Sequence, residues 1–386
     1  MSASETLQQR LAEQSDRRQR LDLQRRLLPA AANGTLDFCS NDYLALRRDE
    51  AVRQAFSDAA QKYGLGAGAS HVLGGHHPEH EALQAELSEW TNRPAGLLFG
   101  SGFQAALGAL AGLASKQDFI AADRLIHACM IDGAKLSGAT LRRFAHNDAE
   151  SAERLFLQKP AQNAALRWLL CESVYSMDGD VAPLLSLLKV AAQHRAVLML
   201  DEAHALGVLG PQGAGLAAKC GLGTAEVPVL MLTFGKALGS AGAALMGELW
   251  LQDALINSAR AFVYTTAMPP ALAAATRTSV RLARFGDDRR AKLQENIAQF
   301  RAQCTKLGIL LLAHADATPI QAIVVGASAR ALNLRDQLSA SGFLVAAVRP
   351  PTVPVGMARL RISLSCAHQS NEISALVEAL ARALEI

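Results

Sequence analysis

The stretch AVLMLDEAH (196–204) decides the fold, because five consecutive apolar residues run directly into Asp201, Glu202 and His204. An apolar run without polar alternation predicts a strand that is buried on both faces, as in a parallel sheet covered by helices. Similar runs occur on both sides of it, namely GLLF (96–99), DFIAAD (118–123), RWLLCES (167–173) and VPVLMLTFGK (227–236).

Helical stretches separate these runs, such as FQAALGALAGLA (103–114) and HACMIDGAKLSG (127–138). Strands that alternate with helices indicate an α/β fold with a mostly parallel central sheet. After Pro269-Pro270 the pattern changes to a long helical region, the strands QAIVVG, FLVAAV and RLRISLS, and the helix ISALVEALARAL. We therefore predict an N-terminal helical arm and strand (1–50), a large domain (51–274) and a smaller C-terminal α+β domain (275–386), with the arm helical over residues 5–28 until Pro29.

The composition excludes several classes of protein. A net charge of +3 spread over 386 residues does not form the dense basic stripe that nucleic-acid binding requires. The six cysteines show no C-x-x-C spacing, which argues against a zinc ribbon or a disulfide scaffold and favours the reducing cytoplasm. The first thirty residues contain no apolar signal region, and the longest apolar stretch, near 105–114, is too short for a membrane span.

Polar residues that end the apolar runs are candidates for chemistry, because ligands of parallel sheets gather at the carboxyl ends of the strands. Asp201 could keep a cofactor ring nitrogen protonated, or it could be a helix N-cap. Lys236 ends a buried run and is flanked by Gly235 and Gly239, so desolvation would favour the neutral amine that forms a Schiff base. The alternative for Lys236 is a surface lysine whose stem packs on apolar neighbours.

Three further motifs each allow more than one interpretation. Gly102 and Phe103 open a helix directly after a strand, where free N–H groups favour a phosphate, although glycine at such turns is also common for steric reasons. The segment 76–80, HHPEH, matches the H-x-x-E-H motif of zinc proteases, but Pro78 belongs in a first helical turn and would leave His76 outside the helix. We therefore expect no metal site. A Rossmann dehydrogenase is also disfavoured, because no strand precedes the glycine run GLGAGASHVLGG.

Ordered motifs along nearly the whole chain resemble the α-oxoamine synthases, pyridoxal-phosphate (PLP) enzymes of the type I aminotransferase fold. The motifs are SNDYLAL (40–46), GAGASHVLGG (66–75), FGSGFQAALGAL (99–110), DRLIHA (123–128), LRRFAHND (141–148), ESVYSMDGD (172–180), LDEAHALGVLG (200–210), TFGKALG (233–239), VYTTAMPPA (263–271) and RPPTVPVGMARLRISL (349–364). The resemblance implies that residues 51–274 form the PLP-binding domain.

The resemblance also implies residue roles. Lys236 matches the Schiff-base lysine, Asp201 the partner of the pyridinium nitrogen, His204 a hydrogen bond to the ring hydroxyl, and His127 the imidazole that stacks on the ring. The other implied cofactor contacts are Gly102, Phe103 and Thr233 at the phosphate, Glu172 and Ser176 beside the ring, and Thr265 and Thr266, which would reach the phosphate of the neighbouring subunit in a homodimer. The implied substrate contacts are Asn41 and Arg361 at the amino-acid carboxylate, and Arg25, Arg349 and Thr352 near the acyl substrate.

The reaction implied is the decarboxylative condensation of an amino acid with an acyl thioester. The RPPTVPVGMARLR and LRRFAHND runs favour the family members that join L-alanine to a pimeloyl thioester, carried by coenzyme A or by an acyl carrier protein, in biotin synthesis. The alternatives within the family are glycine C-acetyltransferase, 5-aminolevulinate synthase and serine palmitoyltransferase. A catalytically silent partner subunit is disfavoured, because Lys236 and Asp201 are both present.

Overall fold

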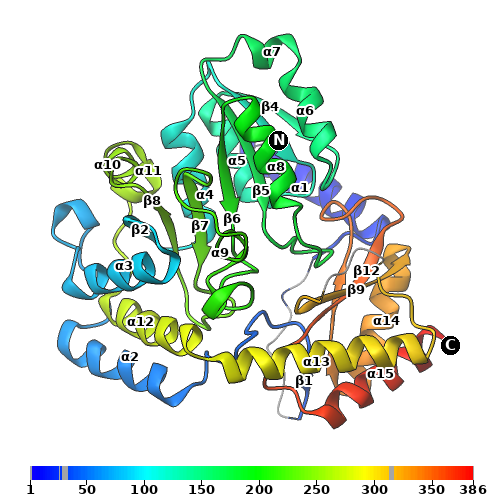
Figure 1. The fold of residues 1–386 in the computed structure, drawn as a ribbon. Coiled ribbons are helices and arrows are strands. Elements are labelled where there is room, and N and C mark those ends of the chain that lie inside the picture. The colour runs from blue at the N-terminus through cyan, green and yellow to red at the C-terminus, as the bar shows by residue number, and fades with distance from the viewer. Residues whose placement is uncertain (1, 26, 28–33, 313–316, 386) are drawn as a thin grey trace. The chain divides into compact units, whose positions relative to one another are not determined.

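The computed structural model describes residues 2–25, 27, 34–312 and 317–385. The chain divides into two compact units (Figure 1), the larger made of Asn41–Ser176 and Asp180–Leu293 and the smaller of Met1–Ser40, Met177–Gly179 and Gln294–Ile386. The large domain was predicted to run from residue 51 to residue 274, whereas the larger unit begins at Asn41 and ends at Leu293. Residue 275 lies inside α12 (Pro270–Arg284), whose buried alanine face packs against α2 (Glu50–Tyr63) and α3 (Pro78–Thr91), so the whole helix belongs to the larger unit.

A mostly parallel sheet forms the centre of the larger unit, as predicted. In the described residues it has seven strands in the order β2-β8-β7-β6-β5-β3-β4. All neighbours from β7 to β4 pair in parallel, and β8 is antiparallel to both β2 and β7. The strands are β2 (Ala95–Phe99), β3 (Phe119–Asp123), β4 (Thr140–Phe144), β5 (Arg167–Glu172), β6 (Ala196–Asp201), β7 (Val229–Thr233) and β8 (Ala243–Gly247).

Helices cover this sheet because its strands are apolar on both faces. Every residue of β2, β3 and β8 is buried, which requires packing against both sides. The remaining helices of the larger unit are η1 (His71–Leu73), α4 (Gly102–Leu113), α5 (Ala128–Ser137), α6 (Ala149–Phe156), α7 (Lys159–Gln162), α8 (Leu184–Gln193), η2 (Pro211–Gly213), α9 (Leu216–Lys219), α10 (Leu249–Ser258) and α11 (Arg260–Val263).

The predicted helices after β2 and β3 are confirmed as α4 and α5, which pack closely against each other. A Cβ atom at Gly133 of α5 would lie 2.9 Å from the backbone oxygen of Ala106 in α4. The close approach of the two helices therefore depends on the missing side chain.

The smaller unit is α+β, as predicted for the C-terminal domain. Its described strands are β1 (Leu36–Asp37) paired in parallel with β10 (Phe343–Leu344), and an antiparallel sheet of β11 (Ala346–Val348), β12 (Ala358–Ser363) and β9 (Ile320–Gly326). Its helices are α1 (Ala3–Arg20), α14 (Ser328–Ala340) and α15 (Ser370–Leu384), and α13 (Asp287–Lys306) crosses the boundary between the units.

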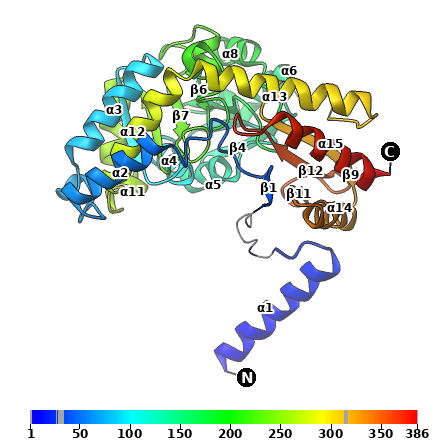
Figure 2. The same ribbon diagram turned by 90° about the horizontal axis from the view of Figure 1, so that it is seen from below.

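The N-terminal helix ends earlier than predicted. Figure 2 draws α1 in blue near the N-terminus, and none of its side chains is buried. It ends at Arg20 because Asp22 has a positive φ of 54° and the N–H of Leu23 bonds the carbonyl of Arg18, which closes the last turn. Pro29, the predicted stop, lies outside the described residues. No helix in the described part of the chain is both long and apolar enough to cross a membrane.

A buried ion network joins the ends of β3 and β4 to the segment after β5. His146 contacts Asp123 through Nδ1 at 2.9 Å and Asp180 through Nε2 at 2.7 Å, and the ring edge of Tyr175 packs on it. Burial alone would lower the pKa of His146, but the two carboxylates outweigh it and raise this pKa to about 10. The side chain is therefore a structural imidazolium at neutral pH.

Replacing this imidazolium should reduce the loss of folding stability that occurs as the pH rises from neutral to alkaline values. His146→Gln leaves two buried carboxylates without their counter-charge, so we expect the free energy of unfolding to fall by about 3 kcal/mol at pH 6. Because the folded-state pKa is raised, the contribution is complete below about pH 6.5 and is lost as the pH rises through about 10. Urea unfolding of both proteins from pH 6 to 10 measures the difference, and a constant difference over this range would contradict the assignment.

Candidate active site

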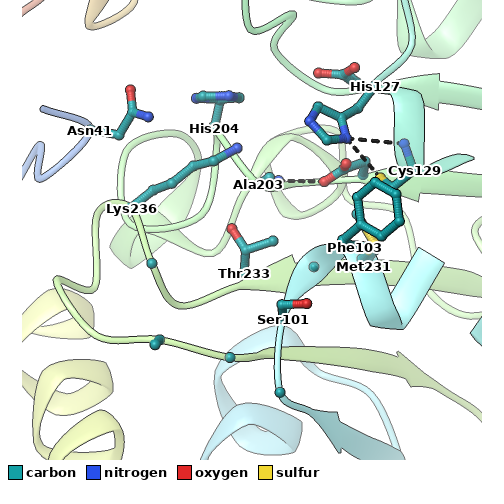
Figure 3. A pocket seen from close by; sticks show the side chains of 17 residues that line it. Asn41, Ser101, Phe103, His127, Cys129, Ala203, His204, Met231, Thr233 and Lys236 are labelled. Atoms are coloured by element: carbon teal, nitrogen blue, oxygen red, sulfur yellow. Dashed lines mark hydrogen bonds between the residues drawn. The ribbon is translucent and has the colours of Figure 1, made fainter. Parts of the chain in front are cut away.

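A pocket lies at the carboxyl ends of β5, β6 and β7 in the larger unit (Figure 3). Its volume is about 350 Å³, which suits a small cofactor. The lining residues are Asn41, Gly100, Ser101, Gly102, Phe103, His127, Cys129, Glu172, Asp201, Ala203, His204, Met231, Thr233, Gly235, Lys236, Ala241 and Gly242. The structure therefore brings together nine of the predicted site residues.

Two carboxylates stand side by side at the floor of the pocket. Glu172 and Asp201 are the last residues of β5 and β6 and are direct partners in the register of the two strands. Burial raises the pKa of Asp201, and Lys236 counteracts part of this shift. Burial, followed by the charge of Asp201, raises the pKa of Glu172 well above its usual range. A positive group beside Asp201 would hold that carboxylate ionised.

Lys236 reaches the pocket from the turn after β7. Figure 3 shows its side chain extending toward His204. Gly239 permits this turn, because it has a positive φ of 59° and a Cβ there would lie 2.2 Å from the backbone nitrogen of Arg47. Gly239 is thus needed for the close packing of this turn against the backbone of Arg47, in addition to leaving Lys236 access to the pocket.

The start of α4 forms a cradle that fits a phosphate. Ser101 is the N-cap residue and accepts a bond from the N–H of Gln104, so the first N–H groups of the helix face outward. A Cβ at Gly102 would lie 2.6 Å from Cγ2 of Thr233, so only glycine leaves the space between them open. The buried Oγ1 of Thr233 has no partner among the described residues, and a phosphate oxygen would supply one.

His127 is fixed by its own helix. It is the N-cap of α5, and its Nδ1 accepts a bond from the N–H of Cys129 at 3.3 Å and lies 2.9 Å from Cys129 Sγ. Burial raises the pKa of Cys129 well above its usual range, so the thiol keeps its proton and can donate it to Nδ1. Burial also lowers the pKa of His127, which leaves a neutral ring with a defined orientation over the pocket.

A tyrosine hydroxyl links two other predicted residues. Tyr43 Oη lies 2.7 Å from His204 Nδ1 and donates to Asn41 Oδ1 at 3.1 Å. Since the hydroxyl has one proton, it accepts from His204 Nδ1–H, and the other ring nitrogen of His204 is then an acceptor. The SNDYLAL segment therefore positions His204 as well as Asn41.

The other predicted residues do not line this pocket. Ser176 lies in a half-buried turn after β5, Thr265 is half-buried, and Thr266 is exposed and bridges to Ser70. Arg361 is a buried residue of β12 in the smaller unit and donates to Ser363 Oγ at 2.8 Å.

The three residues expected near the acyl substrate lie close together in the smaller unit. Arg25 donates to Thr352 Oγ1 at 3.2 Å, and the N–H of Thr352 bonds the carbonyl of Arg349. Arg349 in turn donates to the carbonyl of Asp22. The grouping supports a shared role that the sequence alone could not establish.

Sequence reasoning missed Tyr43, Cys129 and Ser101. Ser101 precedes a predicted helix start and could have been found as an N-cap. Cys129 lies two residues after His127 at a predicted helix start, so its contact with that N-cap residue could also have been found. Tyr43 has no local signal, because only the fold places it beside His204, 161 residues further along the chain.

The sheet, the lysine that follows it, the carboxylate opposite and the phosphate cradle define a PLP-dependent enzyme of the type I aminotransferase fold. The family model described as aminotransferase class I and II matches residues 33–380. The 8-amino-7-oxononanoate synthase of Methylococcus capsulatus is 49% identical over 350 residues, which cover 90% of this chain and 89% of that protein. The 8-amino-7-oxononanoate synthase of Xanthomonas axonopodis pv. citri is 47% identical over 350 residues, which cover 90% of this chain and 86% of that protein.

Solved structures agree. Serine palmitoyltransferase of Sphingomonas wittichii has a TM-score of 0.87 at 31% identity and covers 91% of this chain and 87% of its own. The 8-amino-7-oxononanoate synthase of Francisella tularensis has a TM-score of 0.80 at 30% identity and covers 92% and 99%. The chain belongs to the class I and II aminotransferases and, within them, to the 8-amino-7-oxononanoate synthase family. This confirms the predicted fold class, cofactor and family.

Proposed function

We propose that the protein condenses L-alanine with a pimeloyl thioester and yields 8-amino-7-oxononanoate, carbon dioxide and the free thiol, a step of biotin synthesis. The observation that carries the proposal is a pocket in which Lys236, Asp201 and the Gly102–Thr233 cradle occur together in a chain that is 49% identical to a named synthase of this reaction.

Seven residues of the pocket would hold the cofactor. The N–H groups at Gly102 and Phe103 and the hydroxyl of Thr233 would hold the phosphate, and Lys236 would bind the cofactor covalently through Nζ. Asp201 would pair with the ring nitrogen and keep it protonated, His204 would bind the ring hydroxyl, and His127 would cover the ring face.

The bound cofactor supplies an electron sink for the bonds at Cα of the amino acid. The chain's own residues then control which bond reacts. Asn41 at the pocket would hold the carboxylate of alanine, a role that the family resemblance also assigns to Arg361. The Lys236 amine would take the Cα proton, since it lies at the same site as Asn41. Carbon–carbon bond formation with the thioester expels the thiol, loss of carbon dioxide from the β-keto acid follows, and Cα is reprotonated.

A positive ring nitrogen would keep Asp201 negatively charged, whereas burial and the charge of Asp201 raise the pKa of Glu172 beside it well above its usual range. A neutral Glu172 would donate a hydrogen bond without adding a second charge next to Asp201. The adjacent carboxyls can therefore have different roles, one electrostatic and one as a neutral neighbour of the ring.

We further propose a homodimer in the cytoplasm in which Thr265 and Thr266 reach the phosphate of the neighbouring subunit. Two observations support it. Both threonines lie outside the pocket of their own chain, and the larger unit exposes bulky apolar side chains, Leu73, Trp250 and Tyr264 among them. The acyl donor would be carried by coenzyme A or by an acyl carrier protein.

A panel of substrates tests the reaction. Protein saturated with PLP is incubated with alanine, glycine or serine and with pimeloyl, acetyl, succinyl or palmitoyl thioesters, and thiol release is followed. We expect alanine with the pimeloyl thioester to give the highest kcat/KM, by about 10²-fold or more over glycine with the acetyl thioester. Faster release with serine and the palmitoyl thioester would assign the chain to the serine palmitoyltransferase reaction instead.

A further inference from the structure

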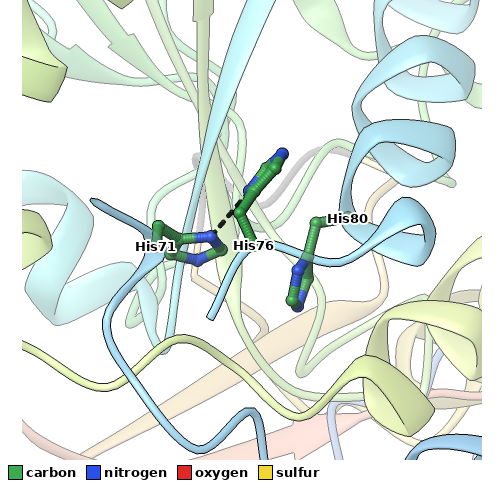
Figure 4. Close-up of side chains that lie close together, drawn as sticks. All are labelled: His71, His76 and His80. Atoms are coloured by element: carbon green, nitrogen blue, oxygen red, sulfur yellow. Dashed lines mark hydrogen bonds between the residues drawn. The ribbon is translucent and has the colours of Figure 1, made fainter. Parts of the chain in front are cut away.

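Three imidazoles meet at one point of the larger unit, and none of them lines the pocket described above (Figure 4). They belong to His71 in η1, His76 in the loop that follows, and His80 in the first turn of α3, and we name them the histidine cluster. One ring nitrogen of each lies within 4.8 Å of the others, and the ring centroids are 4.8 to 5.5 Å apart. Three nitrogens at this spacing need only small ring movements to converge on one ion.

The backbone that carries the cluster is tightly fixed. The N–H groups of Leu73 and Gly75 both bond the carbonyl of Ser70, and Ala267 bonds the carbonyl of Ala69. A Cβ at Gly75 would lie 2.0 Å from the Ala69 oxygen, so no other residue fits this turn. The His71 ring is also stacked on Phe262, with centroids 4.9 Å apart and an interplanar angle of 9°. The first ligand and the turn between the first two are thus preorganised.

The charge state of the cluster suits a metal ion. Burial, and then the neighbouring histidines, lower the pKa of His71 to about 3. Burial lowers the pKa of His80 to about 4. Both rings are therefore neutral at pH 7, and a neutral imidazole is the form that binds transition metals.

The bonds that the cluster makes now can be exchanged for metal bonds. His71 Nδ1 and His76 Nδ1 lie 2.9 Å apart and share one proton. His80 donates through Nε2 to the carbonyl of Met268, and its Nδ1 accepts from the N–H of His77. An ion would replace the shared proton and the bond to His77, whose N–H lies at a half-buried helix N-terminus and can bind water instead.

The remaining bonds would support the metal-bound state. The His80 Nε2–H bond to Met268 orients the ring and directs Nδ1 to the ion, as a carbonyl does behind many histidine ligands. Glu81 Oε1 lies 3.8 Å from His76 Nε2, so a carboxylate stands behind a second ligand as well.

We propose that the histidine cluster binds one divalent transition-metal ion, of which Zn²⁺ is the probe of choice, through one nitrogen each of His71, His76 and His80. Three imidazole ligands with an open position suit Zn²⁺, Cu²⁺ and Ni²⁺. This site differs from the H-x-x-E-H motif of zinc proteases, because α3 begins at Pro78 and leaves His76 before the helix. Glu79, which that motif would use as a base, is paired with Arg277 at 3.0 Å.

Zinc binding is measured on the PLP-saturated protein after removal of metals, by competition with a chromophoric zinc chelator. We expect one Zn²⁺ per chain, and His76→Ala, which removes a partly exposed side chain, should weaken binding at least about tenfold. His71→Ala should do the same. The matched control is His77→Asn, which removes the adjacent imidazole but keeps a favoured N-cap residue, and it should bind zinc as the parent does.

Two readouts separate this site from others. Cys129→Ser removes the thiol beside His127 in the pocket and should leave the cluster's zinc affinity unchanged. Co²⁺ added to the parent should give the visible bands of a low-symmetry nitrogen site, and these should be absent in His76→Ala. Zinc binding that survives both His71→Ala and His76→Ala, or that is lost equally in His77→Asn or in Cys129→Ser, overturns the proposal. None of these measurements depends on catalysis, so the proposed function stands or fails separately.

Discussion

Lys236→Ala is expected to abolish the visible absorbance of the bound cofactor and to lower kcat by at least about 10⁴-fold. The change removes both the amine that binds the cofactor covalently and the base that lies at the same site, and a positioned general base alone contributes about 10² to 10⁴ in rate. The measurements are the absorbance spectrum after PLP addition and the rate of thiol release with alanine and the pimeloyl thioester.

The matched control is Lys219→Ala, which removes an exposed lysine at the end of α9. It should retain the spectrum and the rate. A Lys236→Ala protein that kept either the chromophore or more than a few per cent of the rate would show that another amine does this work, and the assignment of the pocket would be wrong.

Asp201→Asn should lower kcat/KM by roughly 10²-fold while the protein stays folded. An amide of nearly the same shape cannot stabilise a positive charge on the ring nitrogen, and a hydrogen bond to a charged group contributes about 1.5–3 kcal/mol. Asn can still accept the bond that Asp201 Oδ1 now receives from the N–H of Ala203, so the turn after β6 should be preserved. Steady-state rates, together with the PLP dissociation constant, measure the effect.

The neighbouring carboxylate gives the contrast. Glu202 is fully buried, and its two oxygens accept from the N–H groups of Leu216 and Ala217 at 2.9 and 2.7 Å. Glu202→Gln should therefore lower the free energy of unfolding by about 1–3 kcal/mol and change kcat little. If Asp201→Asn instead affected stability and Glu202→Gln affected the rate, the two roles would have to be exchanged.

Strand and helix placement followed from the sequence because each apolar run is long enough to bury a strand on both faces. The runs ending at Glu172, Asp201 and Thr233 became β5, β6 and β7 in one parallel sheet, and parallel strands bring their carboxyl ends to one edge. That rule is why Asp201 and Lys236 could be predicted as members of one site before any coordinates. The resemblance to the α-oxoamine synthases then assigned roles that the periodicity of the sequence could not.

The domain limits and the ends of helices were less predictable, because they depend on which surface a helix covers. α12 has the composition of a surface helix, yet its alanine face is buried against α2 and α3, which moves the limit of the larger unit from the predicted 275 to 293. α1 ends at Arg20 because the backbone turns at Asp22. No glycine or proline at that position predicts the turn from the sequence.

The sequence by itself determined the α/β class and the family, since these depend on local pattern and on short motifs, and it predicted which residues belong to the candidate site. Only the tertiary structure decided what stands beside what: Tyr43 on His204, the Gly102–Thr233 cradle, and the meeting of His71, His76 and His80. Such contacts depend on packing between segments up to 161 residues apart in the sequence. The energy of that packing depends on both segments together, so neither segment alone predicts the contact.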